Sequence, residues 1–198
     1  MSTLPKEYFT IEEYYGLEKS SDRRWEYWDG EIVCMSGGLR NHGKLAARAH
    51  GLLFVRTDGV NCLSFTGEQA VRAETLSGYA YPDASVACGP QYTRHRERGI
   101  DILTNPIVVV EVTSRDSKIR DHHRKLDAYR VNDSLRDYLV IEYDRVLVTH
   151  WQRIGSEWRK AEYLEMSDII STSMQASLTL SDLYLGVDFN ETEDAAPR

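Results

Sequence analysis

The spacing of hydrophobic residues along the chain predicts a mixture of helices and strands. Leu45, Ala49 and Leu53 recur at four-residue intervals, which places them on one face of a helix. Thr10 and Glu13 match a capping box, in which a threonine hydroxyl and a glutamate carboxylate satisfy amides at the start of a helix. Three helices are therefore predicted, from Thr10 to about Leu17, from Asn41 to about Arg56 and from Ser117 to Tyr129.

Runs of β-branched and aromatic residues predict the strands. Ile107–Val112 is apolar except for Glu111, a pattern typical of a central strand covered on both faces. Asp29-Gly30 favours a type I′ turn between two strand-like runs, so Arg24–Met35 is predicted to be a hairpin. The polar, arginine-rich segment Gly89–Thr104 is predicted to be a loop or a short helix. Further strands are predicted around Leu63 and Phe65 and at Gln69–Ala73, Asp83–Cys88, Asp137–Glu142, Val146–Gln152 and Trp158–Leu164.

No repeat, linker or low-complexity stretch divides the chain. Its 198 residues fit one domain, predicted to span residues 1–187, and the acidic segment 188–198 is predicted to be a flexible tail. The longest apolar run, Ile107–Val110, is far shorter than the roughly 20 residues of a membrane span. Residues 1–7 lack the basic start and apolar stretch of a signal peptide, so we expect a cytoplasmic protein with no membrane partner.

Charge and cysteine content exclude few functions by themselves. The formal net charge of −7 argues against a protein that coats nucleic acid, but a local basic surface remains compatible with an enzyme acting on DNA. Segment Arg94–Arg98 is either a phosphate-contacting loop or a solvated one. The cysteines Cys34, Cys62 and Cys88 show no CxxC spacing and are predicted to be separate buried thiols. The six histidines are predicted to be structural and not zinc ligands.

Two carboxylates are candidates for chemistry. Glu111 interrupts an apolar strand, where an ionised carboxylate costs several kcal/mol unless it is paired or bound to a cation. Asp83 follows Pro82 at the start of another predicted strand. Each has an ordinary alternative, an ion pair with an arginine for Glu111 and a turn role for Asp83. Together, carboxylates on two strands can converge on one Mg²⁺, which favours one or two carboxylates plus waters and phosphate.

Several motifs in this order resemble the Uma-type restriction endonuclease family of the PD-(D/E)XK nuclease superfamily. The residues that carry the resemblance, over roughly Tyr8 to Gln152, are Phe9–Tyr14, Trp25–Val33, His42, Pro82-Asp83, Asn105–Ser114, Asp121, Lys125 and Tyr129. The resemblance implies an α/β fold of the restriction-endonuclease type, with a mixed central sheet flanked by helices and an N-terminal helix and β-hairpin. It also implies Mg²⁺-dependent hydrolysis of DNA phosphodiester bonds, with Mn²⁺ as a substitute metal.

The same resemblance assigns roles to three acidic residues. Asp83 and Glu111 would hold the metal, and Glu26 would add a third acidic group from the hairpin. The superfamily pattern has a lysine two residues after the glutamate, where this chain has Thr113. Helical spacing points instead to Lys125, whose ammonium is predicted to lie roughly 3–6 Å from the Glu111 carboxylate. A solvated helix lysine is the alternative for Lys125, and a solvated hairpin residue is the alternative for Glu26.

The sequence is therefore compatible with three functions. They are a DNA endonuclease, an inactive nuclease-fold module that binds nucleic acid or a protein partner, and a metal-dependent hydrolase of a smaller phosphate ester. We expect a homodimer, because closed two-fold dimers are the commonest oligomers and duplex cleavage in this superfamily commonly pairs two sites. Sequence preference and physiological role depend on loop geometry that the sequence does not define.

Overall fold

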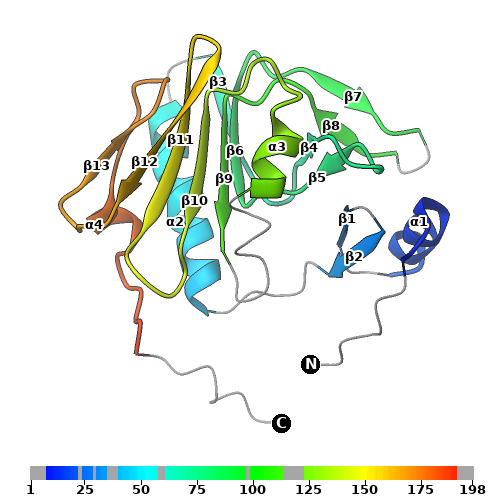
Figure 1. Ribbon diagram of the computed structural model, residues 1–198, viewed down its shortest axis with the longest axis horizontal. Coiled ribbons are helices and arrows are strands. Elements are labelled where there is room, and N and C mark those ends of the chain that lie inside the picture. The colour runs from blue at the N-terminus through cyan, green and yellow to red at the C-terminus, as the bar shows by residue number, and fades with distance from the viewer. Residues whose placement is uncertain are drawn as a thin grey trace.

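A six-stranded mixed sheet forms the centre of the computed structural model (Figure 1), which describes residues 8–21, 24–28, 30–34, 40–57, 61–96, 99–113 and 123–190. In spatial order its strands are β12 (Glu157–Tyr163), β11 (Val148–Ile154), β10 (Asp137–Ile141), β9 (Val108–Val112), β6 (Ala84–Cys88) and β3 (Cys62–Thr66). Strand β9 pairs in parallel with β10 and antiparallel with β6. All five residues of β9 are buried, which confirms the predicted central strand.

Two layers cover the sheet. One layer contains α2 (Arg40–Thr57) and α4 (Leu180–Leu183), and Leu45, Ala49 and Leu53 of α2 pack in the core on that face. The other layer contains α3 (Lys125–Tyr129), whose residues Leu126 and Tyr129 pack beneath it. Small strands β13 (Ile169–Ser171) and β14 (Ser177–Thr179) form a separate pair beside α4. The predicted α/β fold, with helices on both faces of a mixed central sheet, is confirmed (Figure 1).

The N-terminal part contains the predicted helix and hairpin. Helix α1 (Ile11–Ser20) starts at the capping box, in which the Glu13 amide donates to the Thr10 hydroxyl and the Thr10 amide donates to the Glu13 carboxylate. It extends to Ser20, three residues beyond the predicted end, because Glu18 is buried and continues the packed face. Strands β1 (Trp25–Trp28) and β2 (Glu31–Cys34) pair antiparallel, and Gly30 between them has a φ of 91°. Asp29 of the predicted turn lies outside the described residues.

A second sheet lies on the α3 side and corrects one prediction. Its strands, in order, are β5 (Tyr79–Ala80), β4 (Ala70–Arg72), β8 (Asp101–Leu103) and β7 (Tyr92–Arg94). The prediction of a loop or short helix for Gly89–Thr104 was wrong, because aromatic and β-branched residues form an antiparallel hairpin there. Arg94 pairs with Asp101 across this hairpin at 3.2 Å, which supports a solvated surface role for that arginine. Residues 97–98 of the candidate phosphate loop lie outside the described residues.

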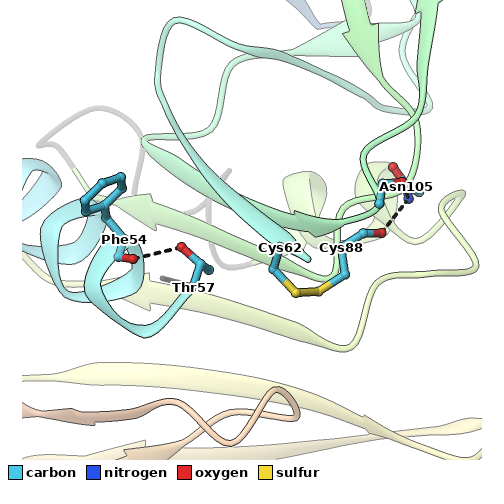
Figure 2. Close-up of a disulfide and its surroundings, with 6 residues drawn as sticks. Phe54, Thr57, Cys62, Cys88 and Asn105 are labelled. Atoms are coloured by element: carbon cyan, nitrogen blue, oxygen red, sulfur yellow. Dashed lines mark hydrogen bonds between the residues drawn. A yellow bond between two sulfur atoms is a disulfide. The ribbon is translucent and has the colours of Figure 1, made fainter. Parts of the chain in front are cut away.

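The prediction of three separate buried thiols was also wrong. Cys62 of β3 and Cys88 of β6 lie directly opposite each other and form a disulfide (Figure 2). Antiparallel pairing of two strands brings together cysteines that are 26 residues apart in sequence. The end of α2 lies beside this bridge, where the Thr57 hydroxyl donates to the carbonyl of Phe54 at 2.9 Å. Cys34 is a free cysteine and is half-buried.

The C-terminal half matches the predicted elements in part. Strands β10 and β11 pair as predicted, and β12 extends the sheet at its outer edge. Of the predicted helix Ser117–Tyr129, only the last turns fall within the described residues, as α3. Residues 117–122 and most of the predicted tail (191–198) lie outside them. Over the described ranges, no helix is long and apolar enough to cross a membrane.

Candidate active site

Strand pairing brings Asp83 and Glu111 to the same end of the central sheet. Ala84 of β6 lies opposite Val110 of β9, so the next pair along this antiparallel register is Asp83 and Glu111. The Asp83 Oδ2 atom accepts a hydrogen bond from the Val112 amide at 2.7 Å. The Asp83 carboxylate therefore continues the ladder between β6 and β9 where a strand carbonyl would otherwise stand. Asp83 and Glu111 therefore lie opposite each other on neighbouring chain segments, as predicted.

Glu111 is buried and bound by two donors from α3. Its side chain is 3% exposed. Lys125 donates from Nζ to Oε2 at 2.8 Å, and Tyr129 donates from its hydroxyl to Oε1 at 3.0 Å. Lys125 and Tyr129 are four residues apart, so they share one face of the helix and meet the same carboxylate. The Lys125 ammonium thus lies beside Glu111, slightly nearer than predicted, and not in bulk solvent.

Glu26 joins the same cluster from the hairpin. Its side chain is 4% exposed, which excludes the solvated hairpin role considered above. Trp28 donates from Nε1 to Oε2 at 2.9 Å, and the Tyr81 amide donates to Oε1 at 2.9 Å. The Lys125 ammonium lies 3.4 Å from Oε2 of Glu26, so one ammonium bridges Glu26 and Glu111. A single ammonium thus faces two carboxylates.

Asp83 is the more accessible of the proposed metal ligands. Its side chain is 15% exposed, against 3% for Glu111. His42, in the first turn of α2, places Nε2 3.5 Å from Asp83 Oδ1 and is 22% exposed. Solvent therefore reaches this group of residues at the Asp83–His42 end, next to the start of α2. The family resemblance includes His42 but assigns no role to it. Its contact with Asp83 shows that His42 lies beside the candidate site.

Thr113 occupies the position of the expected lysine and has a different set of contacts. It is fully buried. Its hydroxyl donates to Glu142 Oε2 at 3.2 Å and accepts from the Tyr143 amide at 3.3 Å. Glu142 follows β10 and is itself 1% exposed. Thr113 thus ties the end of β9 to the end of β10, and the positive charge next to Glu111 comes from Lys125.

The environment of Tyr129 keeps its phenol protonated. Burial raises the pKa of Tyr129 well above its ordinary value, and the negative charges of Glu111 and Glu26 raise this pKa further. A neutral phenol can donate to the Glu111 carboxylate, whereas a phenolate would repel it. Tyr129 therefore holds Glu111 in place as a hydrogen-bond donor across the neutral pH range.

A metal ion at this site would have few protein ligands. Over the described residues, no group of three or more His, Cys, Asp or Glu side chains is arranged to hold a metal ion. A site built on Asp83 and Glu111 would thus have two carboxylate ligands, with the other positions left to water and substrate. That composition suits Mg²⁺, which keeps several waters and binds through one or two carboxylates.

Comparisons with known proteins identify the family of this chain. The family model described as "Uma2: Putative restriction endonuclease" matches residues 11–183. Uncharacterized protein slr1290 of Synechocystis sp. is 27% identical over 90% of this chain and 92% of its own length. Uncharacterized protein sll1609 of the same organism is 27% identical over 78% of this chain and 87% of its own length.

A solved structure shares the fold. The crystal structure of a putative nuclease belonging to DUF820 from Anabaena variabilis superposes with a TM-score of 0.66. The superposition covers 89% of this chain and 97% of that one, at 17% sequence identity. The family match spans helix α1, the hairpin, both carboxylate strands, Lys125 and Tyr129. The chain belongs to the Uma2 family of putative restriction endonucleases.

Proposed function

We propose that this protein is a metal-dependent endonuclease that hydrolyses DNA phosphodiester bonds. The observation that carries the proposal is the buried Glu26–Lys125–Glu111 cluster, with Asp83 opposite Glu111 at the end of the adjoining strand. An ammonium beside a strand carboxylate is costly to bury and contributes little net stability compared with apolar residues of the same size. Such a group is therefore better explained by chemistry than by folding.

The donor atoms of this site fit Mg²⁺, with Mn²⁺ as a substitute. Asp83 and Glu111 offer carboxylate oxygens, which hard cations prefer and which each carry two lone pairs. When bound, the metal supplies Lewis-acid polarisation of the phosphate and lowers the pKa of a bound water. In this proposal Asp83 and Glu111 are the two protein ligands of the metal.

The remaining residues of the site orient groups and place charge. Lys125 puts a positive charge beside Glu111, where it stabilises the negative charge that develops on the attacked phosphate. Glu26 holds the Lys125 ammonium from the other side, and Trp28 and the Tyr81 amide hold Glu26. Tyr129 keeps Glu111 in a fixed orientation. Catalysis then requires Lys125 to shift part of its hydrogen bonding from Glu111 to the phosphate.

The test of this function is cleavage of supercoiled plasmid DNA with millimolar Mg²⁺ or Mn²⁺. Wild-type protein should nick or linearise the plasmid, and Glu111→Ala should lower the rate by at least 10²-fold, the scale of one lost electrostatic element. Glu157→Ala, on the exposed edge of β12, is the control for an added alanine and should cleave normally. Mg²⁺ at a hundredfold excess over its dissociation constant should stabilise the wild-type protein by about 2.7 kcal/mol and so raise its melting temperature. Absence of both cleavage and a Mg²⁺-dependent melt would reject the proposal.

An inactive module that binds nucleic acid or a protein partner is the second candidate. Two observations favour it: both Glu111 oxygens already accept hydrogen bonds from protein donors, and Thr113 stands where the superfamily has a lysine. DNA binding without cleavage in either metal would support this candidate. A homodimer remains a prediction for either function, and light scattering that gives a monomer at micromolar concentration would contradict it.

A further inference from the structure

Strand β12 ends the central sheet on the side away from β3 (Figure 1). Within the described part of the chain, β11 is its only strand partner. The strand has seven residues without proline, and the side chains of Arg159, Lys160, Ala161 and Glu162 are exposed. An edge strand of this length is a template to which a further strand can pair.

The ladder beside β12 defines which of its backbone groups point outward. The Arg153 amide of β11 donates to the Arg136 carbonyl, on the β10 side, at 2.7 Å. Backbone groups alternate in direction along a strand, so the even-numbered residues of β11 face β12 and pair with its odd-numbered residues. Trp158, Lys160 and Glu162 therefore direct their backbone N–H and C=O groups away from β11, toward the outer edge.

A second copy of the chain can pair with this edge in only a few registers. In a two-fold antiparallel pair, residue i lies opposite residue j and j lies opposite i. Opposed residues also lie on the same face of the sheet, so i and j differ by an even number. One residue of β12 must therefore lie opposite its own counterpart, at the two-fold axis.

Charge selects among these registers. With Arg159, Lys160 or Glu162 at the axis, the central side chain faces an identical charge, which destabilises the pair. With Ala161 at the axis, Lys160 of each copy lies opposite Glu162 of the other, and opposite charges in this position are favourable. Arg159 then lies opposite Tyr163 on the other face, where a cation–π contact is possible. A register centred closer to either end of β12 pairs at most three of its residues.

The exposed Leu164 supports the register centred on Ala161. Leu164 directly follows β12, and its side chain is 57% exposed. In this register it lies opposite the half-buried Trp158 of the second copy. Contact between the two side chains would remove apolar surface from water, which favours association.

Charged side chains on an edge strand ordinarily prevent pairing with another chain. In β12 they oppose the registers that place a charge at the axis and favour the one centred on Ala161, so they specify a single pairing. Strand β3, at the other edge of the sheet, has five residues and none is charged. No charge pattern would fix a register there.

We propose that two copies of this chain join through β12, antiparallel and with Ala161 at the two-fold axis, so that one sheet continues across the dimer. Lys160 pairs with Glu162 of its own chain at 2.6 Å, and the interface would join two such pairs into a network of four charges. Strands β11 and β10 separate this edge from β9, so the Glu26–Lys125–Glu111 cluster takes no part in the contact. The proposal concerns assembly and does not depend on DNA cleavage.

A cysteine at the axis tests the register. Ala161→Cys is made in a Cys34→Ala background, where it is the only thiol outside the Cys62–Cys88 disulfide. Because the backbone of Ala161 faces β11, the two copies meet there as a non-hydrogen-bonded pair with Cα atoms about 4.5 Å apart, within disulfide reach. Mild oxidation should therefore give a covalent dimer on a non-reducing gel. Glu157→Cys in the same background is the control, because it is also exposed but lies about 26 Å from its counterpart.

Light scattering of charge variants tests the interface without a cross-link. Lys160→Glu replaces two opposite-charge pairs by two like-charge pairs and should weaken the dimer by about tenfold or more. Adding Glu162→Lys exchanges the charges and should restore the dimer. A monomeric wild type at micromolar concentration, equal cross-linking of Ala161→Cys and Glu157→Cys, or a dimer that Lys160→Glu leaves unchanged would overturn the proposal. A dimer that does not cleave plasmid rejects only the catalytic function, and a monomer that cleaves it rejects only this interface.

Discussion

Replacing Lys125 by methionine tests the buried cluster most directly. Methionine keeps most of the volume of the side chain but removes the ammonium that bridges Glu26 and Glu111. Both carboxylates would then remain in a site where their side chains are 3–4% exposed. Trp28, Tyr81 and Tyr129 would still donate hydrogen bonds, but these three donors are neutral and do not replace the charge of the ammonium.

The expected loss of stability follows from the burial of the pair. Removing one partner from a buried ion pair costs about 3–5 kcal/mol, because the other charge is left uncompensated. For a domain of this size, each kcal/mol corresponds to about 2–4 °C in melting temperature, so the variant should melt about 6–20 °C lower. Adding Glu111→Gln to Lys125→Met removes one of the two stranded negative charges. The double variant should therefore be more stable than Lys125→Met alone.

Urea unfolding at pH 7, followed by circular dichroism, measures these differences. The control is Lys160→Met on β12, where the lysine forms an exposed ion pair with Glu162 at 2.6 Å. Exposed pairs contribute about 0–1 kcal/mol, so this variant should unfold near the wild-type midpoint. The reasoning would be refuted if Lys125→Met lost no more stability than Lys160→Met, or if Glu111→Gln gave no recovery.

Two further predictions concern other parts of the structure. Tyr129→Phe removes one hydrogen bond to the Glu111 carboxylate and should cost about 1.5–3 kcal/mol in urea unfolding at neutral pH. Because the pKa of Tyr129 is raised in the folded state, its contribution to stability is full below about pH 10 and declines as the pH rises above it, where the unfolded chain ionises first. The variant should thus lose less stability than wild type between pH 9 and 11, and an equal loss would contradict the assignment. Reducing the Cys62–Cys88 disulfide, or replacing both cysteines by alanine, should lower the free energy of unfolding by about 3.5 kcal/mol for a loop of this length, and an unchanged urea midpoint under reductant would be inconsistent with the bridge.

Much of the site could be predicted because its residues violate local patterns. Glu111 stands out as the single charge in an apolar strand, and the structure pairs it with a buried cation. Lys125 could be placed because helical periodicity fixes its side of α3 relative to Leu126. Each inference depends only on the pattern of residues within a single strand or helix. The catalytic roles of Asp83, Glu111, Lys125 and Glu26 remain proposals, since placement does not show chemistry.

Other features depend on contacts between distant segments and had no local signal. The burial of Glu26 results from packing of the hairpin against Tyr81 and Lys125, and a glutamate in a short hairpin is ordinarily solvated. The Thr113–Glu142 hydrogen bond requires the parallel pairing of β9 and β10. The β7–β8 hairpin was obscured by the polar and arginine-rich residues around its short strands. In each case the tertiary partner, and not the sequence near the residue, decides the outcome.

The Cys62–Cys88 disulfide also changes how a cut chain would behave. The covalent loop that it closes contains β4, β5 and Asp83, and the turn before β5 exposes Leu76 at its surface. A protease that cleaves in this turn would produce two fragments still joined through the bridge. Asp83 would remain covalently attached beside β3 and β9 after such a nick, and the two pieces would separate on a denaturing gel only under reducing conditions.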